Sequence, residues 1–154
     1  MGEKTSAQTP NERLIVESLD REFARLHVRS CAIVEKMTDE TLYSSNPGAT
    51  SVGDSILRCA AEIEQTFGGV TANLWDDPFE WTLPEQLSTR SKVLEHLGEV
   101  EALRQRAFTS FSDDACLSKH VATPSTGTQP LIELLLKTLL RASDHQSQAR
   151  ATLR

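Results

Sequence analysis

Cysteine is scarce in this sequence, and the three cysteines stand far apart. Cys31, Cys59 and Cys116 form no Cys-x-x-Cys pair, which argues against a disulfide framework and against a structural zinc cluster. Long apolar runs are missing too, because no stretch approaches the roughly 18 residues that a membrane span requires. Residues 1–10 contain no apolar signal core. We therefore expect a flexible polar leader over residues 1–10 and a cytoplasmic location.

Basic residues are outnumbered and scattered along the chain. Lys and Arg total 16 against 22 Asp and Glu, so the net charge is −6. Phosphate groups of nucleic acids are bound by clustered cations, and the composition therefore argues against a nucleic-acid partner. A length of 154 residues suits one domain with its own core. We expect a single domain over residues 11–154, with neither a membrane nor a nucleic-acid partner.

Apolar residues recur at helical spacing in four segments. These run from Asn11 to about Met37, from Ser51 to Gly68-Gly69, from about Ser88 to Phe111, and from Pro130 to the C-terminus. Ser51-Val-Gly-Asp54 predicts an N-cap, and the glycine pair predicts the end of the second helix. No alternating run predicts a β-strand. The pattern is typical of an all-α protein, and a four-helix bundle is its simplest assembly.

The predicted helices are joined by long loops. The connection between the second and third helices has about 18 residues, enough to run back along the bundle, so we expect a crossover that leaves these helices parallel. It contains Trp75, Phe79 and Trp81. Aromatic side chains here either cover one end of the bundle, which we favour, or line the mouth of a pocket.

One stripe of the last predicted helix turns from apolar to polar halfway along. Its members at i, i+3 and i+4 spacing are Leu134, Thr138, Arg141, His145, Gln148 and Thr152. Such a face packs against the core at one end and lines a solvated or charged region at the other. A binding site is expected where the stripe becomes polar.

Two segments make the chain resemble the DinB/YfiT-like family. They are Ser51-Val-Gly-Asp-Ser-Ile-Leu-Arg-Cys59 and Asp144-His-Gln-Ser-Gln148. The resemblance implies a dimeric four-helix bundle with a metal such as zinc or nickel, held by a histidine on helix two and a His-x-x-x-His pair on helix four. In this chain the second histidine of the pair matches His145, the following glutamine matches Gln148, and the first histidine falls on Arg141. The helix-two ligand falls on Cys59, or on Arg58 if the register slips by one.

Arg141 alters what the resemblance implies, because a guanidinium stays protonated and cannot ligate a cation. At best His145 and Cys59 remain as metal ligands, and we expect no metal cofactor. Arg141 is instead expected to pair with an inward acid such as Glu62 or to bind an anionic ligand. Glu62 also lies one turn from Arg58, which predicts an ion pair between them.

Cys59 and His145 also have structural explanations. Cys59 lies on an apolar stripe between Ile56 and Ile63 and is better explained as a small core residue than as a ligand. His145 is as well explained by a hydrogen bond in the bundle, or by an exposed position, as by a site. No catalytic residue can be assigned from the sequence.

Two functions are therefore expected from the candidate site, which comprises Arg141, His145, Gln148 and Cys59. The first is a bundle without the three-histidine metal site that binds a small anionic or thiol ligand or acts as a homodimeric interaction module. The alternative, implied by the family resemblance, is a metal-dependent thiol transferase or isomerase with a non-standard site.

Overall fold

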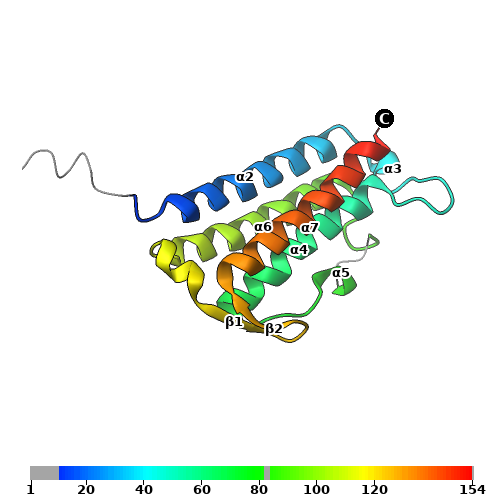
Figure 1. The fold of residues 1–154 in the computed structure, drawn as a ribbon. Coiled ribbons are helices and arrows are strands. Elements are labelled where there is room, and N and C mark those ends of the chain that lie inside the picture. The colour runs from blue at the N-terminus through cyan, green and yellow to red at the C-terminus, as the bar shows by residue number, and fades with distance from the viewer. Residues whose placement is uncertain (1–10, 82–83, 154) are drawn as a thin grey trace, which may run out of the picture.

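The computed structural model describes residues 11–81 and 84–153, and the predicted leader over residues 1–10 lies outside them. Four long helices form a bundle, as the sequence predicts (Figure 1). They are α2 (Leu14–Glu35), α4 (Val52–Ala72), α6 (Arg90–Ser110) and α7 (Leu131–Thr152). The connections contain α3 (Asp39–Leu42), α5 (Pro78–Trp81), the 3-10 helix η1 (Asp114–Ser118), and strands β1 (His120–Thr123) and β2 (Gly127–Pro130). No helix in these ranges has the length and apolar character of a membrane span.

The helices run in two opposed pairs. α2 and α7 point in one direction and α4 and α6 in the other (Figure 1). The chain between α4 and α6 passes back along the bundle and forms α5 on the way, so the expected crossover is confirmed. α4 packs on α7 and α6, and α2 packs on α6 and α7. This arrangement makes the α4–α7 seam one edge of the bundle, beside the crossover segment.

Helix α4 begins where the sequence predicts and ends later. The Ser51 hydroxyl accepts a hydrogen bond from the Asp54 amide at 3.1 Å, which confirms the N-cap. The Gly68-Gly69 pair does not end the helix, which runs to Ala72. Its C-cap residue, Asn73, adopts the left-handed conformation (φ 58°). Gly69 serves packing instead, because a Cβ there would overlap the ring of Trp75. The missing side chain lets the crossover segment lie directly on α4.

The segment before α7 is a β-hairpin, although the sequence shows no strand pattern. β1 and β2 pair antiparallel, with Val121 opposite Gln129, and Gly127 has a positive φ of 74°. Each strand has only four residues, too few for alternation to stand out from a polar loop. The hairpin folds back over the start of α7 and therefore adds a wall at the end of the α4–α7 seam (Figure 1).

Aromatic rings fill the core where three of the long helices meet. Phe23 of α2 lies edge-on to Phe67 of α4, with ring centroids 5.3 Å apart, and both rings contact Phe108 of α6. At the same end of the bundle, the Asp114 carboxylate accepts hydrogen bonds from the amides of Ile15 and Val16, which are otherwise unpaired in the first turn of α2. These contacts hold the loop that leads to the hairpin against the bundle.

Candidate functional site

A groove follows the seam between α4 and α7 and contains two hollows that share Gln65. The first, the hairpin hollow, has a volume of about 110 Å³ and lies between the two helices, the hairpin and the crossover segment. Its polar lining comes from Gln65, Thr66, Thr123, Ser125, Thr126, Gln129, Lys137 and Arg141. The second, the His145 hollow, has a volume of about 60 Å³ and is lined by Arg58, Ala61, Glu62, Gln65, Asp77, Phe79 and His145.

Buried hydroxyl groups join the two helices beneath the hairpin hollow. Thr138 donates to the carbonyl of Leu134 at 2.9 Å, so its oxygen accepts from the Thr66 hydroxyl at 2.6 Å. Each side chain is almost fully buried. Because both hydroxyls have hydrogen-bond partners, burying them costs little free energy of folding. The small threonines also allow α4 and α7 to approach closely, which fixes the spacing of the groove walls.

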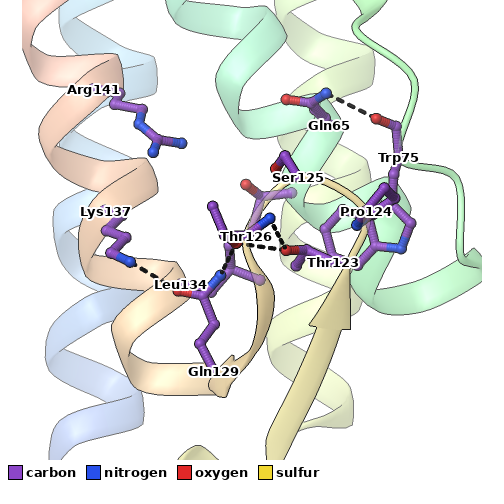
Figure 2. Close-up of a pocket in the computed structure, with 11 residues that line it drawn as sticks. Gln65, Trp75, Thr123, Pro124, Ser125, Thr126, Gln129, Leu134, Lys137 and Arg141 are labelled. Carbon is purple, nitrogen blue, oxygen red and sulfur yellow. Dashed lines mark hydrogen bonds between the residues drawn. The ribbon is translucent and has the colours of Figure 1, made fainter.

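Hydroxyl groups of the β-turn form one wall of the hairpin hollow. The Thr123 oxygen accepts a hydrogen bond from the Thr126 amide at 3.3 Å, and the two hydroxyls lie 2.6 Å apart. The Gln129 side-chain amide donates to the Thr126 hydroxyl oxygen at 2.9 Å, and Lys137 donates to the Gln129 side-chain oxygen Oε1 at 3.1 Å (Figure 2). The turn is therefore held in place by a chain of hydrogen bonds that reaches α7.

Two cations of α7 border this hydroxyl wall. Lys137 also pairs with Glu133 at 3.1 Å, so its charge is partly compensated. Arg141, one turn further along, extends from α7 toward the hollow (Figure 2). No carboxylate oxygen of a described residue lies within 4.0 Å of its guanidinium. The hairpin hollow thus presents a planar cation that has no carboxylate partner among the described residues, opposite several hydroxyl groups.

Trp75 and Gln65 form the facing wall. Gln65 donates to the Trp75 carbonyl oxygen at 2.8 Å, and the indole N–H donates to the Asn73 side chain at 2.8 Å. The indole ring lies over Gly69, as described above. Trp75 and Phe79 line the hollows, and Phe79 also packs against the core. The side chain of Trp81 is outside the described part.

The His145 hollow pairs an imidazole with a carboxylate across the seam. His145 Nε2 lies 3.7 Å from Glu62 Oε1, and His145 Nδ1 is buried without a hydrogen-bond partner among the described residues. Arg58 places its guanidinium 4.1 Å from the centre of the Phe79 ring. The predicted Arg58–Glu62 ion pair is not formed. Glu62 faces inward as expected, with His145 as its neighbour.

The candidate residues from the sequence separate into two groups. Arg141 and His145 both reach the groove, each in a different hollow. Cys59 lines neither hollow, because its sulfur lies in the core 3.9 Å from the Ser30 hydroxyl, where burial raises the pKa of the thiol to about 12. Gln148 is exposed and lines neither hollow.

Helix α7 also directs the polar side chain of Gln146 into the core. Its amide donates to the Leu26 carbonyl at 2.8 Å and to the Ser30 hydroxyl at 2.9 Å. α7 packs on both α4 and α2, so its buried face is centred between these neighbours, and Arg141 and His145 fall on the edge beside α4. Lys137 lies on the same edge at i, i+4 spacing from Arg141, a signal that the sequence offers. The hairpin hydroxyls offer no such signal.

The donor set does not fit the metal that the family resemblance implies. Arg141 occupies one ligand position and cannot ligate, and Cys59 is a protonated core thiol away from His145. Residues 11–81 and 84–153 contain no cluster of three His, Cys, Asp or Glu side chains arranged to hold a metal ion. The chemistry of the groove is therefore that of a cation, hydroxyl groups and a carboxylate–imidazole pair.

Comparison of the chain with protein-family models, curated proteins and solved structures gives no match.

Proposed function

We propose that this protein is a DinB/YfiT-like bundle that binds a small organic anion in the hairpin hollow in place of a metal. The observation that carries the proposal is Arg141, whose guanidinium faces the hollow without a carboxylate partner among the described residues. A guanidinium offers paired donors that match a carboxylate or phosphate, and such charge-assisted hydrogen bonds are stronger than neutral ones.

The remaining lining supports the same class of ligand. The Ser125 hydroxyl is a donor within the same hollow, and Lys137 adds a second cation. None of the described residues that line it carries a carboxylate. Trp75 supplies a flat apolar wall, which favours an anion with a carbon skeleton over a bare inorganic ion.

Calorimetric titration with short carboxylates tests the proposal. Hexanoate and phenylacetate should bind to the wild type, and Arg141→Gln should weaken binding by roughly 10- to 100-fold, the equivalent of losing one charged hydrogen-bonding partner. Arg150→Gln is the matched control, because Arg150 is exposed on the same helix and lines neither hollow. Equal affinities for wild type and Arg141→Gln would refute the proposal.

A further inference from the structure

The two hollows of the groove differ in the sign of the charges that line them. Lys137 and Arg141 line the hairpin hollow, and the part of the chain that the structure describes adds no carboxylate to this lining. Glu62 and Asp77 line the His145 hollow. Among the described residues Arg58 is the one permanent cation in that lining, and its guanidinium is stacked on an aromatic ring. The two carboxylates of the described lining outnumber this cation, so the two hollows differ in charge along the groove.

Glu62 has hydrogen-bonding capacity left for a ligand. Its contact with His145 Nε2 is 3.7 Å, which is too long for a hydrogen bond. Glu62 accepts no hydrogen bond from the described residues, and its side chain is 25% exposed. The Glu62 carboxylate can therefore accept a hydrogen bond from an ammonium group that enters the hollow. Partial burial makes that interaction stronger than it would be in bulk water.

The charged groups that would contact the ligand lie in different hollows. Arg141 and His145 are one turn apart on α7, roughly 5–6 Å between their Cβ atoms, and Glu62 is the near neighbour of His145. Arg141 lines the hairpin hollow and Glu62 lines the His145 hollow, so the guanidinium and the carboxylate lie at opposite ends of the groove. A ligand that reaches both carries its two charges at opposite ends of a chain.

The available space suits a ligand of modest size. The hollows have volumes of about 110 Å³ and 60 Å³ and share Gln65 in their linings, and the side-chain amide of Gln65 donates to the Trp75 carbonyl oxygen. A cavity of about 150 Å³ is enough for a benzene molecule. A chain of a few methylene groups with a charge at each end matches these volumes.

We infer that the ligand is a zwitterion of the ω-amino acid type, with its carboxylate on Arg141 and its ammonium on Glu62 and Asp77. This inference rests on the proposed function and names the substrate class of the same groove. Gln65, which lines both hollows, lies beside the middle of the ligand.

Calorimetric titration with three probes of equal chain length tests the inference: 6-aminohexanoate, hexanoate and hexylamine. The wild type should bind 6-aminohexanoate roughly fivefold or more tightly than hexanoate, the gain expected of a partly buried ion pair. Glu62→Gln should abolish that preference and leave hexanoate binding unchanged. Arg141→Gln should weaken both acids. Glu95→Gln, at an exposed position on α6, is the control.

The outcomes separate the two proposals. If hexanoate and 6-aminohexanoate bind equally and both depend on Arg141, the zwitterion is excluded and the anion site stands. If neither acid binds, or if Arg141→Gln leaves the affinity for both acids unchanged, the proposed function itself is refuted. If Glu62→Gln weakens hexanoate as much as 6-aminohexanoate, while its thermal unfolding matches the wild type, Glu62 does not recognise the ammonium and the inference is overturned.

Discussion

Replacing Arg104 by methionine tests how much a buried ion pair stabilises the bundle. Arg104 belongs to α6, and its side chain is only 1% exposed. It donates to Glu101 through Nε at 2.7 Å and through a terminal nitrogen at 2.9 Å, and to Asp20 of α2 at 2.6 Å. Burial alone lowers the pKa of Arg104, but the two carboxylates raise it above its ordinary value. Arg104→Met keeps the aliphatic contacts and deletes the charge.

The magnitude follows from how exposed each abandoned carboxylate is. Glu101 is 11% exposed and would remain nearly buried without a partner, whereas Asp20 is 45% exposed and can regain hydration. Breaking a buried ion pair costs about 3–5 kcal/mol. Because one of the two acids is half exposed, we expect a loss of about 3 kcal/mol in the free energy of unfolding. For a domain of this size, that corresponds to a decrease in Tm of roughly 6–12 °C.

Urea denaturation followed by circular dichroism measures this loss. The double variant Arg104→Met/Glu101→Gln should regain about 1 kcal/mol or more, since it removes the uncompensated charge. Arg106→Met, at an exposed position on the same helix, should stay within about 0.5 kcal/mol of wild type. A loss below about 1 kcal/mol for Arg104→Met, or a double variant no more stable than the single one, would refute this explanation.

Three further outcomes follow from buried polar groups. Gln146→Leu removes the amide that donates to Ser30, and we expect it to lower the free energy of unfolding by about 1–3 kcal/mol in urea titrations. At pH 8 a thiol reagent should leave Cys59 unmodified in the folded protein, because its pKa of about 12 keeps it protonated, and Cys31→Ser should remove the fastest reaction. Burial raises the pKa of Glu64 in the folded protein. The protonated side chain therefore contributes fully to the free energy of unfolding below about pH 4.5, and this contribution is lost as the pH rises through the folded-state pKa. Glu64→Gln should therefore gain stability relative to wild type between pH 4.5 and 7, and a constant difference would contradict the assigned burial effect.

Much of the bundle follows from local pattern. The apolar spacing predicts all four long helices, and the Ser51 hydroxyl caps the second as its sequence indicates. The length of the connection predicts the crossover. By contrast, the end of α4 does not follow, since Gly68 and Gly69 both lie within the helix and Gly69 leaves room for the ring of Trp75. Glycine is an ambiguous signal because it relaxes both backbone and packing constraints.

The sites are only partly visible in the sequence. Arg141 and His145 are recognisable because they share one edge of a helix whose face turns polar. Cys59 directs its thiol into the core toward Ser30, the position that its apolar stripe favours. The buried face of α7 also differs from the predicted stripe, because Gln146 is buried and Gln148 is exposed. One residue rotates a helix by about 100°, so the choice between them depends on which neighbours the helix contacts.

The sequence alone determines the helices, their order and the cation at position 141, because these depend on local periodicity, capping and residue chemistry. Only the tertiary structure decides that Glu62 meets His145, that the hairpin hydroxyls face Arg141, and that Trp75 lies over Gly69. Those contacts join residues far apart along the chain, and they depend on how α7 rotates between α2 and α4. That rotation is set by the packing of the whole core, which no short segment encodes.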